Sequence, residues 1–279
     1  MESKIIPSLW FEAEAAEAME FYQSVFPGSK IIRSTPILVV GSLAGVRFLA
    51  LNGRPKAIKP NPAISFMVTF ERREEIDAAW ARLLDGGKVY MELGAYDWSD
   101  YYGWVADKYG FTWQLYLGKL EDVKHQRVVP TLMFCGPQQG NCESAVGFYE
   151  RLFPDFIAQG ILRYPEGEFK GQVVHAQFAI AEFVMAAMDS GVPQDFTFNE
   201  SVSLSLMCAD QAEIDRYWDG FTRTGAELPC GWCRDPYGVH WQVVPRNIDE
   251  LMTQAPNAKQ AFSAMLKMRK IVIKDLENA

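Results

Sequence analysis

Residues 103–114 read Gly103-Trp104-Val105-Ala106-Asp107-Lys108-Tyr109-Gly110-Phe111-Thr112-Trp113-Gln114, and residues 231–242 read Gly231-Trp232-Cys233-Arg234-Asp235-Pro236-Tyr237-Gly238-Val239-His240-Trp241-Gln242. Both stretches follow the pattern Gly-Trp-x-x-Asp-x-Tyr-Gly-x-x-Trp-Gln, which is far more identity than unrelated segments share. Upstream, Phe21-Tyr22 with Phe26-Pro27 returns as Phe148-Tyr149 with Phe153-Pro154. The chain of 279 residues is therefore a tandem duplication.

The boundary between the copies lies near residues 118–128. We predict an N-terminal domain over 1–120, a C-terminal domain over 126–248 and a helical tail over 249–279. The first copy carries an insert from Tyr90 to Tyr102, and the second copy is longer around 155–175.

Each copy shows the same order of hydrophobic patterns twice. A β-rich run is followed by apolar residues at helical spacing, as in Ala15 to Phe26, and then by three more strand patterns. This order predicts four βαβββ modules and an α+β fold in which two tandem domains each consist of two modules. We expect curved mixed sheets that enclose a cavity, because the helices cover one sheet face and leave the other free. The sequence leaves open which modules pair.

Composition excludes several classes of protein. The chain is 49% hydrophobic and carries 27 Lys and Arg against 35 Asp and Glu, a net charge of −8. No basic block offsets this balance, so neither nucleic acid nor an anionic membrane is an expected partner. Met1 to Lys4 lead directly into a strand pattern without the apolar core of a signal peptide, and five cysteines make no disulfide framework. We expect a cytoplasmic protein.

Several strings in the first copy resemble those of one protein family. They are Ile6-Pro7-Ser8-Leu9-Trp10-Phe11, Ala18-Met19-Glu20-Phe21-Tyr22, Leu49-Ala50-Leu51-Asn52-Gly53 and Tyr102 to Gly110 with Trp113-Gln114. They are similar to the PhnB-like proteins, also called 3-demethylubiquinone-9 3-methyltransferase-like, of the vicinal-oxygen-chelate superfamily. That superfamily includes glyoxalase I and the fosfomycin-resistance proteins. The resemblance implies the paired βαβββ fold but names no substrate.

The resemblance also implies where a divalent metal would lie in catalytic members of the superfamily. Gln114 and Gln242 occupy the position of the glutamate ligand on the last strand. The other ligand positions fall at Pro7 or Ser8, Ala63 or Ile64, Pro130 or Thr131, and Ser201 or Val202. A neutral amide without anionic or imidazole neighbours does not hold a hard divalent ion. We therefore expect no metal cofactor, with a divalent metal as the alternative.

Strand alternation selects the candidate ligand-binding residues. If Trp113 packs under the helices, Gln114 and Thr112 face the cavity, and Gln242 and His240 do so in the second copy. The competing interpretation is that each Trp-Gln pair provides only packing and a buried amide hydrogen bond. Of the other histidines, we expect His125 in the linker to be solvated and His175 to be structural.

Two further motifs favour ordinary structure over chemistry. Cys230-Gly231-Trp232-Cys233 has redox or zinc spacing, but it enters a strand and has few other ligands nearby. A methyltransferase that uses S-adenosylmethionine usually has a glycine-rich turn in a doubly wound sheet, and no such turn occurs here. We consider methyltransferase activity excluded on these grounds.

Two segments suggest further roles. The aromatic insert Tyr90 to Tyr102 is expected to be a loop that forms a lid over the first cavity or fills an interface. In the tail, Ala261, Phe262, Met265, Leu266 and Met268 form an apolar stripe that could dock in cis or make a homodimer.

The leading functional hypothesis is metal-independent binding of a small molecule. The alternatives are a divalent-metal lyase or dioxygenase-type enzyme, and a structural or partner-binding module. Because Thr112 corresponds to His240, we expect the two copies to bind a ligand unequally. An ordinary histidine changes charge near pH 6.5, so we expect any pH-dependent binding in the second copy.

Overall fold

The computed structural model describes residues 3–279, so the first two residues of the N-terminal stretch lie outside the described part. The predicted order of one strand, one helix and three strands is found four times. The α+β class and the βαβββ modules are thus confirmed. The first module contains β1 (Ile5–Trp10), α1 (Ala15–Val25), β2 (Lys30–Ser34), β3 (Leu38–Leu43) and β4 (Val46–Leu51). The second contains β5 (Ile64–Phe70), α2 (Arg73–Leu84), β6 (Lys88–Tyr96), β7 (Ser99–Ala106) and β8 (Thr112–Leu117).

The second copy repeats this order after a short 3₁₀ helix, η1 (Leu120–Val123). Its first module contains β9 (Val128–Phe134), η2 (Gly136–Gln138), α3 (Cys142–Leu152), β10 (Phe156–Arg163), β11 (Val173–Ile180) and β12 (Phe183–Asp189). Its second contains β13 (Val202–Cys208), α4 (Gln211–Thr222), β14 (Ala226–Glu227), β15 (Trp232–Arg234) and β16 (His240–Pro245). The tail forms α5 (Ile248–Thr253), α6 (Ala258–Met265) and α7 (Ile273–Glu277).

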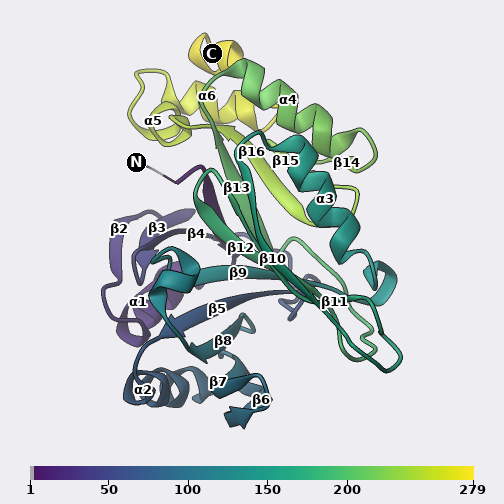
Figure 1. Ribbon diagram of the computed structural model, residues 1–279. Coiled ribbons are helices and arrows are strands. Elements are labelled where there is room, and N and C mark those ends of the chain that lie inside the picture. The colour runs from purple at the N-terminus through teal and green to yellow at the C-terminus, as the bar shows by residue number, and fades with distance from the viewer. Residues whose placement is uncertain (1–2) are drawn as a thin grey trace. The chain divides into compact units, whose positions relative to one another are not determined.

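The chain divides into two compact units, one of residues 3–6 with Ser203–Ala279 and one of Pro7–Val202. The larger unit contains a complete eight-stranded sheet in the order β10-β11-β12-β9-β5-β8-β7-β6 (Figure 1). Its central pair is β5 with β9, antiparallel, with Ser65 opposite Thr131. The second module of the first copy therefore shares a sheet with the first module of the second copy. The sequence left open which modules pair, and in the larger unit the modules that share this sheet come from different copies.

Helices cover one face of this sheet. Trp113 of β8 is fully buried and its ring lies 5.0 Å from Tyr22 and 4.8 Å from Phe26, both at α1. On the other half of the sheet, Phe178 of β11 contacts Tyr149 of α3. We call the opposite face, which carries the alternate residues of these strands, the inner face. The same unit also pairs β1 with β4 in parallel and β4 with β3 in antiparallel orientation.

The smaller unit has the strand order β14-β15-β16-β13. Helix α4 covers one face, where the ring of Phe221 stacks on Trp241 at 4.7 Å. The start of β1 joins the free side of β13, because the Met207 amide donates to the carbonyl of Lys4. The helix α4 begins with a reciprocal cap: Asp210 accepts from the Glu213 amide, and Glu213 accepts from the Ala209 amide.

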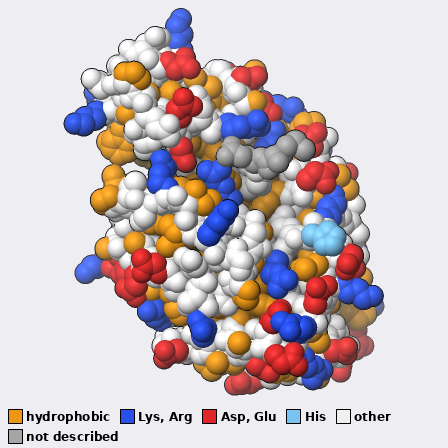
Figure 2. All heavy atoms as spheres, turned by 90° about the vertical axis from the view of Figure 1, so that its left-hand side faces the viewer, with side chains coloured by type: hydrophobic (Ala, Val, Ile, Leu, Met, Phe, Trp, Pro, Cys, Tyr) orange, Lys and Arg blue, Asp and Glu red, His pale blue; other side chains and the backbone are white. Residues whose placement is uncertain are grey.

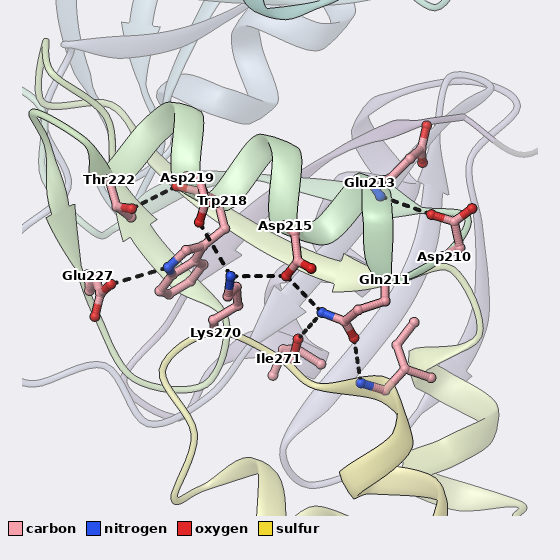
Figure 3. A network of polar contacts seen from close by, with 11 residues as sticks. Asp210, Gln211, Glu213, Asp215, Trp218, Asp219, Thr222, Glu227, Lys270 and Ile271 are labelled. Atoms are coloured by element: carbon pink, nitrogen blue, oxygen red, sulfur yellow. Dashed lines mark hydrogen bonds and ion pairs between the residues drawn. The ribbon is translucent and has the colours of Figure 1, made fainter.

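The tail docks in cis within the smaller unit. The amides of Cys230 and Gly231 donate to the carbonyls of Met268 and Arg269 at 2.8 and 2.7 Å. Lys270 pairs with Asp215 and Asp219, and the Gln211 side chain bonds to the tail backbone (Figure 3). Of the predicted apolar stripe, Ala261 is buried and Leu266 is exposed. Docking in cis was one of the two alternatives that the sequence left open.

The surface carries charges of both signs. On the face shown in Figure 2, Lys and Arg side chains lie among Asp and Glu side chains. Among residues 3–279, no helix is long and apolar enough to cross a membrane.

Candidate functional site

Gln114 lies at the centre of a group of inner-face side chains on three adjacent strands. It stands opposite Met67 of β5 and Trp104 of β7. Because side chains alternate along a strand, the residues two positions away on each strand point to the same face. The other members of this group, which we call the Gln114 group, are Ser65, Thr69, Tyr102, Ala106, Thr112 and Tyr116.

Two hydrogen bonds fix the amide of Gln114. The Tyr102 hydroxyl donates to Gln114 Oε1 at 2.7 Å, and Gln114 Nε2 donates to Ser65 Oγ at 2.6 Å. Gln114 is 7% exposed and Tyr102 is 3% exposed. Burial raises the pKa of the Tyr102 phenol well above its usual range, so the hydroxyl remains a donor at neutral pH. The amide is thereby held in one orientation.

Thr112 is on the inner face, as predicted, and is fully buried. Its hydroxyl lies 3.4 Å from the carbonyl oxygen of Ile64, a long contact that leaves the group weakly engaged. Thr131, the partner of Ser65 in the β5–β9 ladder, is also buried. A role of Thr112 in ligand binding stays a prediction.

The aromatic insert is not a loop, contrary to the sequence-based expectation. Its residues extend β6 and β7 into a hairpin whose last pair is Tyr96 with Ser99. The rings of Tyr96 and Trp98 stack at 5.7 Å, and Trp98 meets Tyr102 edge-on at 4.6 Å. Because Tyr102 bonds to Gln114, the hairpin is connected to the candidate site by direct contacts. A function as a lid stays a prediction.

The linker between the copies covers another part of the inner face. Val123 packs with Val129, Val184 and Ala186, and Leu120 and Met67 lie against this cluster. The Asp122 carbonyl accepts from Gln177. His125 is exposed, as predicted. The linker thus covers the Met67 side of the Gln114 group.

The smaller unit contains an arrangement that corresponds to the Gln114 group. Gln242 stands opposite Ser205 and Trp232, and its Nε2 donates to Ser203 Oγ at 2.9 Å. His240 stands opposite Arg234 and is 4% exposed. The position of Tyr102 is taken by Cys230. The two copies therefore keep the Gln–Ser hydrogen bond and differ in the groups around it.

His175 lies on β11 and is half-buried. Burial lowers the pKa of its imidazole, and a hydrogen bond with Gln177 partly offsets that effect. This environment favours the neutral form, and a structural role of His175 stays a prediction.

The surroundings of the CxxC thiols favour the protonated form. Burial raises the pKa of Cys230 and of Cys233, and in Cys233 the charge of Asp235 adds to the effect. Both cysteines are free. A redox site needs the thiolate form, so these surroundings disfavour redox chemistry.

The acid of the repeated motif stabilises the fold. Asp107 accepts hydrogen bonds from the amides of Tyr109 and Phe111, from the indole of Trp113 and from the hydroxyl of Tyr22. Asp235 accepts from the amides of Tyr237 and Val239 and from the indole of Trp241. Gly110 and Gly238 close these turns with φ of 88° and 97°. The predicted turn is confirmed, and the carboxylate also orients the tryptophan.

The donor groups near Gln114 do not fit a divalent metal. The amide oxygen already accepts from Tyr102, and its neighbours are neutral. Among residues 3–279, no three His, Cys, Asp or Glu side chains lie close enough together to hold a metal ion. The positions that the family resemblance assigns to metal ligands are Pro, Ser, Ala, Ile, Thr and Val. Side chains of these types lack the anionic and imidazole groups that such an ion requires.

The family model described as "3-demethylubiquinone-9 3-methyltransferase" matches residues 3–116 and 126–244. The chain belongs to this family. The two matched segments correspond to the two sequence copies, so this PhnB-like, glyoxalase-related family is present twice. The mixed sheets differ from the parallel doubly wound sheet that binds S-adenosylmethionine in most methyltransferases. No curated protein matches the chain.

Two solved structures are similar to this chain. A PhnB protein from Bacillus cereus, titled a putative 3-demethylubiquinone-9 3-methyltransferase, is 36% identical and covers 42% of this chain and 100% of its own, with a TM-score of 0.40. A glyoxalase I mutant from Zea mays is 13% identical and covers 90% of this chain and 97% of its own, with a TM-score of 0.58. At that identity the likeness shows the fold alone.

The sequence did not reveal three of the groups around Gln114. Ser65, Tyr102 and Trp104 become its neighbours only through strand register. The alternation on residues 99–106 could have indicated Tyr102 and Trp104, since both follow the parity of the inner face.

Proposed function

We propose that this chain is a metal-independent binding protein for a small molecule, with Gln114 as the polar anchor of its first site. The observation that carries the proposal is the fixed amide of Gln114, held by Tyr102 and Ser65 among neutral side chains. Gln114 has one remaining amide hydrogen and a free lone pair that a ligand can use. Preorganised polar groups in apolar surroundings are typical of small-molecule sites.

The second anchor is Gln242, with His240 beside it and Thr112 as the counterpart of His240 in the first copy. Because the groups around the two glutamines differ, we expect unequal affinities. A ligand titration between about pH 5.5 and 8 on wild type and His240→Thr tests this non-equivalence. Equal affinities at the two sites would contradict it.

The main test is a fragment screen by ligand-observed NMR, on protein purified without chelators and again after treatment with EDTA. We expect the same hits in both samples and at least tenfold weaker binding for Gln114→Ala. Gln23→Ala, which removes an exposed amide on α1, is the control. Hits that disappear with EDTA, together with stoichiometric Zn, Ni, Mn or Fe by elemental analysis, would support the metalloenzyme alternative instead.

A further inference from the structure

Trp104 carries a buried hydrogen-bond donor beside Gln114. Its indole Nε1 is buried and has no acceptor among residues 3–279. Trp104 stands directly opposite Gln114 in the β7–β8 ladder, so both side chains lie on the inner face. Leaving a buried donor without an acceptor is unfavourable, because the group has lost its hydrogen bonds to water. Such a group is typically retained where something else supplies the acceptor.

Gln114 and Trp104, which are partners in the β7–β8 ladder, both carry a donor hydrogen that a ligand can use. Gln114 uses one amide hydrogen on Ser65 and keeps the other. A carbonyl oxygen has two lone pairs and can accept from both the Gln114 amide and the Trp104 indole. The Thr69 hydroxyl, on the same face, is also buried without a partner among the described residues.

The neighbouring side chains select against a charged ligand. All nine members of the Gln114 group, including Gln114 itself, are neutral. A charged ligand would lose its hydration without gaining a partner of opposite charge from this group. Lys88 lies at the edge of the sheet, where its Nζ is 5.1 Å from the ring of Tyr90.

Aromatic side chains border the same donors. Tyr90 lies 5.5 Å from Trp104 with an interplanar angle of 35°, and Tyr96, Trp98 and Tyr102 form the hairpin cluster. Trp98 is 58% exposed and Tyr90 is 39% exposed. Ring faces and edges of this kind favour contact with another planar ring.

We propose that the Gln114 site binds a neutral planar ring compound whose carbonyl oxygen accepts a hydrogen bond from Trp104 Nε1. This inference rests on the proposed function, and it adds the chemical class of the ligand. Gln114 supplies the second hydrogen bond, and the aromatic hairpin contacts the ring.

Three aromatic probes of similar size separate the contribution of the carbonyl acceptor from that of the ring and test the effect of charge. Acetophenone has the ring and the carbonyl, ethylbenzene lacks the acceptor, and benzoate carries a charge. We expect acetophenone to bind at least tenfold more tightly than either of the others. The ¹H–¹⁵N signal of the Trp104 indole, assigned by its loss in Trp104→Phe, should move downfield with acetophenone. The Trp113 indole already donates to Asp107 Oδ2, so its signal is the internal control.

Trp104→Phe keeps a ring and removes one of the two donors, so its preference for acetophenone over ethylbenzene should be smaller than that of wild type. Trp80→Phe, on helix α2 and outside both the Gln114 group and the hairpin, is the matched control, and its preference for acetophenone should equal that of wild type. Equal binding of the two neutral probes to wild type, an unshifted Trp104 signal, preference for benzoate or no binding of any probe would overturn the inference. Fragment hits that depend on Gln114 but not on Trp104 would refute this inference and leave the proposed function standing.

Discussion

At the scale of single residues, the carboxylate of Asp107 joins three parts of the larger unit. It closes its own turn, orients Trp113 and accepts from Tyr22 of α1 at 2.7 Å. Burial raises the pKa of this carboxyl, although the four hydrogen bonds act in the opposite direction. The repeated Asp and Trp of the sequence motif therefore act together, because the Asp both closes the turn and orients the Trp.

Asp107→Asn should destabilise the larger unit. One side of the new amide can still accept from the turn, but its NH₂ group meets the indole and phenol donors. We expect a loss of about 1–3 kcal/mol in the free energy of unfolding, measured with urea at pH 7. Asp97→Asn, an exposed acid in the hairpin turn, removes the same charge and should change stability little. Equal stability of the two variants would contradict the assignment.

Glu213 gives the smaller unit a pH-dependent contribution. Burial acts to raise the pKa of this carboxyl, but the hydrogen bonds from Lys4 Nζ and the Ala209 amide outweigh it, so the pKa is lowered from 4.5. A carboxyl with a lowered pKa in the folded state stabilises the fold above its unfolded pKa. This contribution is lost as the pH falls through the folded value.

Glu213→Gln should therefore be less stable than wild type by about 1 kcal/mol at pH 7, because the pair is partly exposed. The difference should shrink as the pH falls from about 5 to 3. Urea midpoints followed by circular dichroism at several pH values measure it. The control is Glu92→Gln, an exposed acid on β6. A difference that grows toward acid pH would refute the interpretation.

At the scale of elements, the sequence predicted the βαβββ order and the face of Gln114 correctly because both depend on local periodicity. It misassigned the insert because the turn between Tyr96 and Ser99 consists of Asp97-Trp98, which lacks the glycine or asparagine that usually marks a hairpin. It could not show that Tyr102 and Trp104 flank Gln114, because β6 and β7 pair with several register shifts. Those contacts depend on long-range pairing.

Deleting the C-terminal tail tests whether it docks in cis or makes a homodimer, the two alternatives that the sequence left open. Deleting residues 257–279 removes buried Ile271 and Leu276 and the backbone bonds to Cys230 and Gly231. We expect Cys230 to react with a thiol reagent at least tenfold faster, because it loses its cover and the burial that raises its pKa. The other cysteines are buried, and Cys230→Ser in the same background identifies the reacting thiol.

The oligomer mass of this deletion variant, measured by light scattering, should equal that of wild type, because the tail docks in cis. Lys270→Ala, which removes only the ion pairs to Asp215 and Asp219, should increase the reactivity of Cys230 less. A halved mass would show instead that the tail makes a dimer.

At the scale of the whole molecule, the sequence copies and the sheets have different boundaries. The sheet of the larger unit takes β5 to β8 from the first copy and β9 to β12 from the second. The first strands of all four modules are short and mostly apolar, so their sequences do not specify which of them pair. Whether 1–120 and 126–248 fold as independent domains stays a prediction.

Cutting the chain between the copies tests whether each copy folds alone or whether the two copies depend on the sheet that they share. A protease site inserted between Lys124 and His125 lies in an exposed turn where both residues have positive φ. After cleavage, the halves should remain together in size-exclusion chromatography, because the β5–β9 ladder from Ile64 to Val68 and from Val128 to Leu132 spans the cut. The uncleaved insertion variant is the control for the insertion itself. Separation would leave β5 and β9 as unpaired apolar strands, so we do not expect it. Separate elution of two folded halves would mean instead that each copy is complete alone.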